Sequence, residues 1–503
     1  MPRSRNVVIP LTFPIGGVVR RYAYQKQGFA STPDANNIWP TDGTTGRERG
    51  ATRPGLTSAT PSIGVPRNWC EIAYDSSGFH RGVAVACSNG AWTIESASSS
   101  AVELITDSAS SDFCSVACYR NNLYFARGTE ATLYRSLASG SGSGTALSNA
   151  GGGTAPTKCG LVEVHEDRLV LAGDTDHGNI IYFSATGDPT DWDYADTSPS
   201  AAVAITVPGI ITAIKRHTEG CLIICCTDST YVIRGNPRTG RLALLSPEVG
   251  ALMQSALAHD SAGNLWMWTR DGLYMMPAGC GGAPQSVSAE SLPLDLREID
   301  PGTSSTYVSL AYDQRFRKLH LYYDKPSGTD QHWVYDLQAE GGGFWPMSFS
   351  TTLRLGVPLK SAATTTKSAL LAITAAGAVS QFDTASSETI SSYYLVGPVA
   401  LGGGDRMGKM LDLVVTLGES SGAVTPKVFV GDSPTQAYAA YVADTPAWTG
   451  GSMAVTGLNY RQHPQIAGSA AYVYLAGTNN AKFQVEEVYT TLWQGAGPRR
   501  VSA

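Results

Sequence analysis

The chain has 503 residues, 16% of them charged, with 54 glycines, 27 prolines and a formal net charge of −6. This balance, without long runs of one sign, excludes a basic surface that wraps or reads nucleic acid. Nine cysteines without a C-x-x-C pair argue against a zinc cage or a disulfide framework and fit a reducing cytoplasm, and no apolar run reaches the roughly 20 residues that span a bilayer.

Residues 1–65 are expected to form an extended N-terminal arm. Pro10 and Pro14 interrupt its first apolar stretch, so we expect no signal peptide. Further on, the arm carries aromatic and basic residues among glycines and prolines. Because exposed Trp and Arg are enriched at interface hot spots, four of them are candidate docking residues. The alternative is that the glycines and prolines only shape a strand and the arginines are solvated. The candidates are Trp39, Arg47, Arg49 and Arg53.

Residues 66–390 contain seven units in which a β-branched or aromatic run, a tight turn and a second run follow one another. An aromatic residue recurs in the second run every roughly 40 to 60 residues. This period predicts an all-β fold, a β-propeller of six or seven blades, whereas a set of antiparallel sandwiches has no reason to keep it. The recurring positions are Trp92, Tyr134, Tyr182, Tyr231, Tyr274 and Trp333, with Val379 in the seventh unit.

Residues 391–503 contain longer alternating strands, which predict a C-terminal antiparallel β domain or a sheet that closes the propeller. Within them, GESSG at residues 418–422 matches the G-x-S-x-G of serine hydrolases. A nucleophile elbow needs a helix after the serine, but AVTPKVFVG reads as a strand. We therefore expect a hairpin loop and no catalytic residue, although Asp444 and His463 follow Ser420 in the order of a hydrolase triad.

Two acidic stretches, DTDHGN and GDPTDWDYADT, carry several carboxylates on short loops. The Glu that closes an EF-hand calcium loop is missing from the first, and both have the composition of turns. No phosphate-binding glycine loop and no histidine pair at helical spacing is present in the sequence. We expect no metal and no cofactor.

Three stretches together resemble one family. PTDGTTGRERGATRPG at residues 40–55, the third unit EDRLVLAGDTDHGNIIYFSATGDPTDWD, and the closing segment AKFQVEEVYTTLWQGAGPRR are similar to segments of the tail nozzle and tail hub proteins of short-tailed bacteriophages. The family-like residues of the third unit are Arg168, Gly187, Asp188, Pro189 and Trp192.

The resemblance implies a structural virion protein without enzymatic activity, assembled in the host cytoplasm. It implies a six-copy ring in the phage tail, docked below the portal and adaptor proteins and in contact with other tail proteins such as fibres or spikes. The ring would surround the DNA exit channel, retain the packaged genome and guide its ejection, without reading the sequence of the passing double-stranded DNA. The alternative from the residues themselves is a β-propeller that binds carbohydrate or acts as a hydrolase, with acidic and aromatic residues at its axis.

Overall fold

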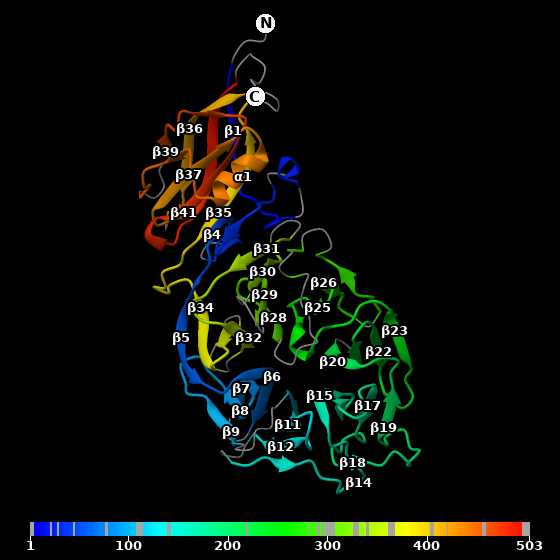
Figure 1. The fold of residues 1–503 in the computed structure, drawn as a ribbon. Coiled ribbons are helices and arrows are strands. Elements are labelled where there is room, and N and C mark those ends of the chain that lie inside the picture. The colour runs from blue at the N-terminus through cyan, green and yellow to red at the C-terminus, as the bar shows by residue number, and fades with distance from the viewer. Residues whose placement is uncertain are drawn as a thin grey trace.

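Seven four-stranded antiparallel sheets follow one another along the middle of the chain, and two further sheets are built from its two ends (Figure 1). The structure is a computed structural model, which describes residues 5–20, 23–27, 30–43, 46–75, 79–106, 114–137, 142–217, 220–279, 281–288, 292–293, 296, 307–324, 331–338, 342–360, 368–402, 407–419, 421–454 and 459–494. Among these residues, no helix is long and apolar enough to cross a membrane.

Each four-stranded sheet is one blade of a β-propeller, in which neighbouring blades bury their faces against one another. Blade 1 consists of β6 (Pro66–Asp75), β7 (Phe79–Cys87), β8 (Gly90–Ile94) and β9 (Val102–Thr106), and blade 2 of β10 (Ser115–Tyr119), β11 (Asn122–Ala126), β12 (Leu133–Ser136) and β13 (Thr145–Ala146). Blade 3 consists of β15 (Cys159–His165), β16 (Arg168–Asp174), β17 (Ile180–Phe183) and β19 (Val203–Thr206). Blade 4 consists of β20 (Ile211–His217), β21 (Cys221–Cys226), β22 (Thr230–Arg234) and β23 (Leu242–Ser246).

Blades 5 to 7 complete the circle. Blade 5 consists of β24 (Leu257–His259), β25 (Leu265–Thr269), β26 (Gly272–Met276) and β27 (Gln285–Ser286). Blade 6 consists of β28 (Tyr307–Asp313), β29 (Lys318–Asp324), β30 (Gln331–Asp336) and β31 (Phe344–Met347). Blade 7 consists of β32 (Leu353–Leu359), β33 (Ala369–Thr374), β34 (Ala378–Asp383) and β5 (Gly55–Ser62). The prediction of an all-β propeller is confirmed, and its blade number is seven.

The recurring aromatic of the sequence lies on the third strand of each blade. Trp92 lies on β8 and Trp333 on β30, and the equivalent Val379 lies on β34. Each predicted two-run unit therefore supplies strands two and three of one blade. The long interval between Tyr274 and Trp333 contains the connection from β27, which ends at Ser286, to β28, which begins at Tyr307.

The N-terminal residues do not form an arm. β5 is the outer strand of blade 7, where Gly55 pairs with Asp383 of β34. β1 (Arg5–Pro10) pairs with β42 (Val485–Gln494), and β2 (Ala35–Asn36) pairs with β35 (Tyr393–Ala400). The arm prediction is wrong because each of these strands finds its partner several hundred residues away, where no local pattern could indicate the pairing.

The two ends of the chain form a β-sandwich. One sheet runs β1, β42, β36 (Gly408–Leu417), β39 (Asn459–Gln462), with β40 (Ile466–Gly468) also on β36. The other runs β2, β35, β41 (Ala470–Gly477), β37 (Val424–Gly431), β38 (Trp448–Thr449). The nine-residue helix α1 (Pro434–Val442) packs on β37 and β41, and the Ser433 side chain caps it by accepting from the Gln436 amide.

One hydrophobic cluster joins the sandwich to the propeller. It includes Val415 and Leu492 of the sandwich, and it continues into Trp268 of blade 5 and into Leu310 and Phe344 of blade 6. The hairpin of β3 (Ile38–Thr41) and β4 (Glu48–Thr52) lies at this junction, with β4 near the sandwich and β31 beside the hairpin (Figure 1). Because packed cores deform little, the two parts form one stiff body.

Candidate functional site

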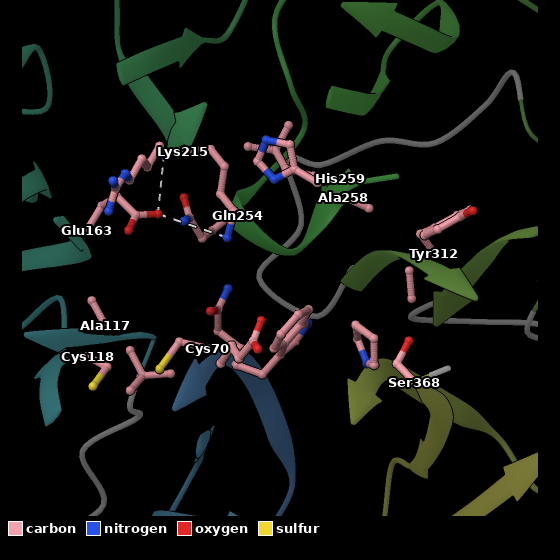
Figure 2. A pocket seen from close by; sticks show the side chains of 18 of the residues that line it. Cys70, Ala117, Cys118, Glu163, Lys215, Gln254, Ala258, His259, Tyr312 and Ser368 are labelled. Atoms are coloured by element: carbon pink, nitrogen blue, oxygen red, sulfur yellow. Dashed lines mark hydrogen bonds and ion pairs between the residues drawn. The ribbon is translucent and has the colours of Figure 1, made fainter. Parts of the chain in front are cut away.

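A cavity of about 400 Å³ lies where the inner strands of the seven blades converge. Its volume is within the range of small-molecule sites. Every inner strand, or the turn next to it, contributes to the lining, so the residues come from positions far apart in the sequence (Figure 2). They include Glu71, Cys118, Glu163, Lys215, His259, Tyr312 and Lys360.

The charged side chains of the cavity differ in how fully they are bonded. Glu71 accepts from Arg81 at 2.7 Å and from Lys360 at 3.1 Å. Burial acts to raise the pKa of Glu71, but these two cations lower it overall. Glu163 accepts from the Val164 backbone N–H at 3.0 Å. Both carboxylates are therefore held in place by the protein itself.

Lys215 lies beside Glu163 and Gln254 and points toward Glu163 (Figure 2). The distance from its Nζ to the Glu163 carboxylate is 3.9 Å, beyond hydrogen-bond length. Burial raises the pKa of the Cys70 thiol, and Lys215 opposes this rise. Burial also lowers the pKa of His259 to about 3, and Lys215 adds to this shift. The Lys215 ammonium therefore affects the pKa values of one group on blade 1 and one group on blade 5.

Two histidines connect blades 4 and 5 beside the cavity. His217 Nε2 lies 3.1 Å from the Pro277 carbonyl and must donate to it, so His217 Nδ1 accepts from His259 Nε2 at 3.1 Å. Burial also raises the pKa of the Cys118 thiol to about 11, so it is protonated at neutral pH and a poor nucleophile. The cavity is suited to binding polar groups rather than to nucleophilic chemistry.

Three of the four candidate docking residues are buried inside the chain, which removes the reason for their assignment. Trp39 is 0% exposed, Arg53 is 1% and Arg49 is 5%. Trp39 packs edge-on against Phe316 at 5.2 Å. Arg47 is the exposed member of the set. The sequence could not distinguish a hairpin at an internal junction from an exposed loop, because both need the same turn residues.

The buried arginines fasten the β3–β4 hairpin to both parts of the structure. Arg49 pairs with Asp42 at 2.8 Å and with Glu486 of β42 in the sandwich. Arg53 donates to the Glu388 carboxylate at 3.0 and 3.2 Å and to the Ser348 carbonyl after blade 6 at 3.0 Å.

The family-like residues of blade 3 build a turn. Arg168 is fully buried and donates to the carbonyls of Ser184 and Ala201. Asp188 accepts from the Thr190 backbone and hydroxyl, and Pro189 accepts from the fully buried Trp192 indole at 3.0 Å. Gly187 has a φ of +81°, which favours glycine. These residues shape the blade and leave no open site.

The carboxylates of the acidic stretches accept hydrogen bonds from backbone N–H groups two residues further along the chain. Asp191 accepts from Asp193, Asp193 from Ala195, and Asp196 from Ser198. Within the part of the chain that the structure describes, no group of three or more His, Cys, Asp or Glu could hold a metal ion. Seven cysteines of the described residues are free, but Cys221 is disulfide-bonded, contrary to the expectation from the cysteine spacing.

The GESSG stretch is a connection between the two sheets of the sandwich, and its assignment as a hairpin loop is wrong. β36 precedes it in one sheet and β37 follows it in the other. Ser420 lies outside the described residues. Asp444 pairs with Lys427 at 2.7 Å, and His463 pairs with Asp412 at 2.6 Å. The acid and the histidine therefore have different partners and do not form a dyad.

No protein-family model matches the chain, and no curated protein is significantly similar to it in sequence. Solved β-propellers are similar in fold. A chain of the mitotic checkpoint complex has 12% identity and a TM-score of 0.41, covering 67% of this chain and 96% of that one. The WD40 propeller domain of Doa1 has 10% identity and a TM-score of 0.40, covering 66% and 96%. BamB from Moraxella catarrhalis has 12% identity and a TM-score of 0.36, covering 75% and 97%. The likeness concerns the fold alone.

Proposed function

We propose that this chain is a structural subunit of a short-tailed bacteriophage tail, in which six copies form a ring around the DNA exit channel. The ring retains the packaged genome and guides its ejection, and it docks on the portal and adaptor proteins and on other tail proteins. The proposal starts from the resemblance of three stretches to tail nozzle and hub proteins.

The observation that carries the proposal is the continuous core between propeller and sandwich. A subunit that resists the pressure of packaged DNA must not bend between its parts, and the buried cluster together with the arginine pairs of the β3–β4 hairpin opposes such bending. A stiff wedge that meets its neighbour by a head-to-tail contact closes into a ring.

The charge of the chain suits a channel that DNA crosses without adhesion. Six copies, each of formal net charge −6, would carry −36 together. A lumen without a basic lining releases few phosphate counterions and so does not grip the duplex. The cavity at the propeller axis has the size of a small-molecule site, so the DNA would pass between copies.

Light scattering on the purified chain, followed by negative-stain imaging with and without tailless DNA-filled heads, tests this function. A ring in solution, or a monomer that becomes a ring on heads, would support it. A monomer that ignores heads would instead favour a ligand-binding or hydrolytic propeller, for which the axial cavity is the favouring observation.

The exposed Arg47 gives the corresponding variant. Arg47→Ala should leave the monomer folded and weaken ring formation or head attachment, because an exposed arginine contributes to interfaces through charge and hydrogen bonds. Arg270→Ala on blade 5, also at an exposed arginine, is the control. Equal assembly of the two variants would remove Arg47 from the docking surface.

A further inference from the structure

The axial cavity contains an ammonium group that the protein leaves available. Lys215 has no hydrogen-bond acceptor within bonding distance among the described residues, and its nearest carboxylate oxygen, on Glu163, is 3.9 Å away. Its side chain is 29% exposed, so it is reached from solvent through the cavity. A lysine ammonium has three donors, and none of them is committed here.

Two acids of the lining, Asp260 and Glu71, are by contrast already satisfied by other partners. Asp260 accepts from the backbone of Ala262 and Asn264 and from the Trp266 indole. Glu71 is neutralised by Arg81 and Lys360. The bonding capacity that remains is that of a cation, which selects a ligand with an anionic group.

Apolar side chains complete the lining. Trp69, Val116 and Leu257 face the same cavity as Lys215, and the volume of about 400 Å³ exceeds that of a small inorganic ion. A ligand that fills it needs an apolar body as well as a charged end.

We propose that the axial cavity binds a small organic carboxylate, whose anionic group bonds to the Lys215 ammonium and whose apolar body lies against the apolar part of the lining. Glu163 competes for the same ammonium and keeps it in place while the site is empty of ligand. This role is independent of ring formation and goes beyond the proposed tail function.

Isothermal titration calorimetry of the full chain with benzoate tests the proposal, with benzyl alcohol as the uncharged counterpart. The wild type should bind benzoate and not benzyl alcohol. Lys215→Gln should weaken benzoate binding roughly tenfold or more, because a charge-assisted hydrogen bond is lost. Lys158→Gln, which removes an exposed lysine paired with Asp176 outside the cavity, should leave binding unchanged.

Glu163→Gln separates a binding role from a structural one. Glutamine keeps an oxygen acceptor for the backbone N–H of Val164 but no longer attracts Lys215, so benzoate should bind more tightly than to the wild type. If no heat appears at millimolar benzoate, if benzyl alcohol binds as well as benzoate, or if Lys215→Gln binds as the wild type does, the proposal is wrong. Weaker binding by Glu163→Gln would also overturn it.

Discussion

Arg53 and Glu388 are joined by two hydrogen bonds, at 3.0 and 3.2 Å, although 335 positions separate them in the chain. The guanidinium also lies 4.2 Å above the Phe349 ring. Burial lowers the pKa of Arg53, and the Glu388 carboxylate opposes this shift. The pair therefore ties the N-terminal hairpin to the segment that leaves the propeller.

Removing one partner of this pair should destabilise the chain strongly. Arg53→Ala leaves a carboxylate and several carbonyls without their donor, and we expect a loss of about 3–5 kcal/mol in the free energy of unfolding. Urea denaturation followed by circular dichroism measures it. Arg120→Ala breaks an exposed pair with Asp167 and should lower the free energy of unfolding much less, because solvent screens an exposed ion pair. Similar losses for both variants would show that the Arg53–Glu388 pair stabilises the chain no more than an exposed ion pair does.

Trp39 should behave as a core residue and not as a docking residue. Trp39→Ala removes a fully buried ring that packs on Phe316 and Phe382, so we expect a loss of about 3–5 kcal/mol. Thermal denaturation gives the comparison with Trp493→Ala, whose ring is 41% exposed and which should lose much less. A folded Trp39→Ala monomer of wild-type stability that fails to assemble would restore the docking assignment.

The closure of blade 7 should depend on one glycine. Gly377 has a φ of +87°, and a Cβ there would lie 1.9 Å from the Ile63 carbonyl oxygen at the end of β5. Gly377→Ala should therefore lower the melting temperature more than Gly235→Ala, whose φ of +62° costs about 1 kcal/mol but whose Cβ would meet nothing within 4 Å. Equal melting temperatures would mean that backbone conformation alone matters at the closure.

Stability should decrease with rising pH through the titration of Asp313. Burial raises the pKa of this carboxyl to about 6, above its ordinary value of 3.8. The folded state thus binds the proton more tightly, and the stabilisation is present below about pH 4 and lost as the pH rises through 6, by about 3 kcal/mol. Asp313→Asn should remove this component.

The measurement is the urea midpoint at pH 4 to 8 for the wild type, Asp313→Asn and the exposed control Asp228→Asn. As the pH rises, the urea midpoint of the wild type should fall relative to that of Asp313→Asn. The midpoint of Asp228→Asn should follow that of the wild type. A constant difference across this range would show that Asp313 does not titrate in the folded state near pH 6.

Local patterns predicted the parts of the fold whose partners are close in sequence. The two runs around Trp92 or Tyr231 pair through a short turn, so their alternation and aromatic residues were enough to place strands two and three of each blade. The helix α1 was missed, although Ser433 followed by Pro434 is an N-terminal helix signal.

Long-range relationships carried no such signal. Lys215 and Glu163 belong to different blades, and only the closed propeller brings them into one cavity. The same is true of Arg49 and Glu486, which the sequence predicts to lie in an arm and in a C-terminal domain. Arginines beside glycine and proline looked exposed because turns usually are, and here the turn is covered by the second domain.

The pairing of β5 with β34 and of β1 with β42 also determines when the chain can finish folding during synthesis. Gly55 cannot pair until Asp383 has been synthesised, and Arg5 cannot pair until Gln494 has been synthesised. At roughly 5–20 residues per second, the first pairing is delayed by about 16–66 s after the N-terminal strand is made, and the second by longer still. The propeller cannot close before Asp383 has been made, and the sandwich cannot close before Gln494 has been made, so the sandwich is the later of the two and is completed near the end of translation.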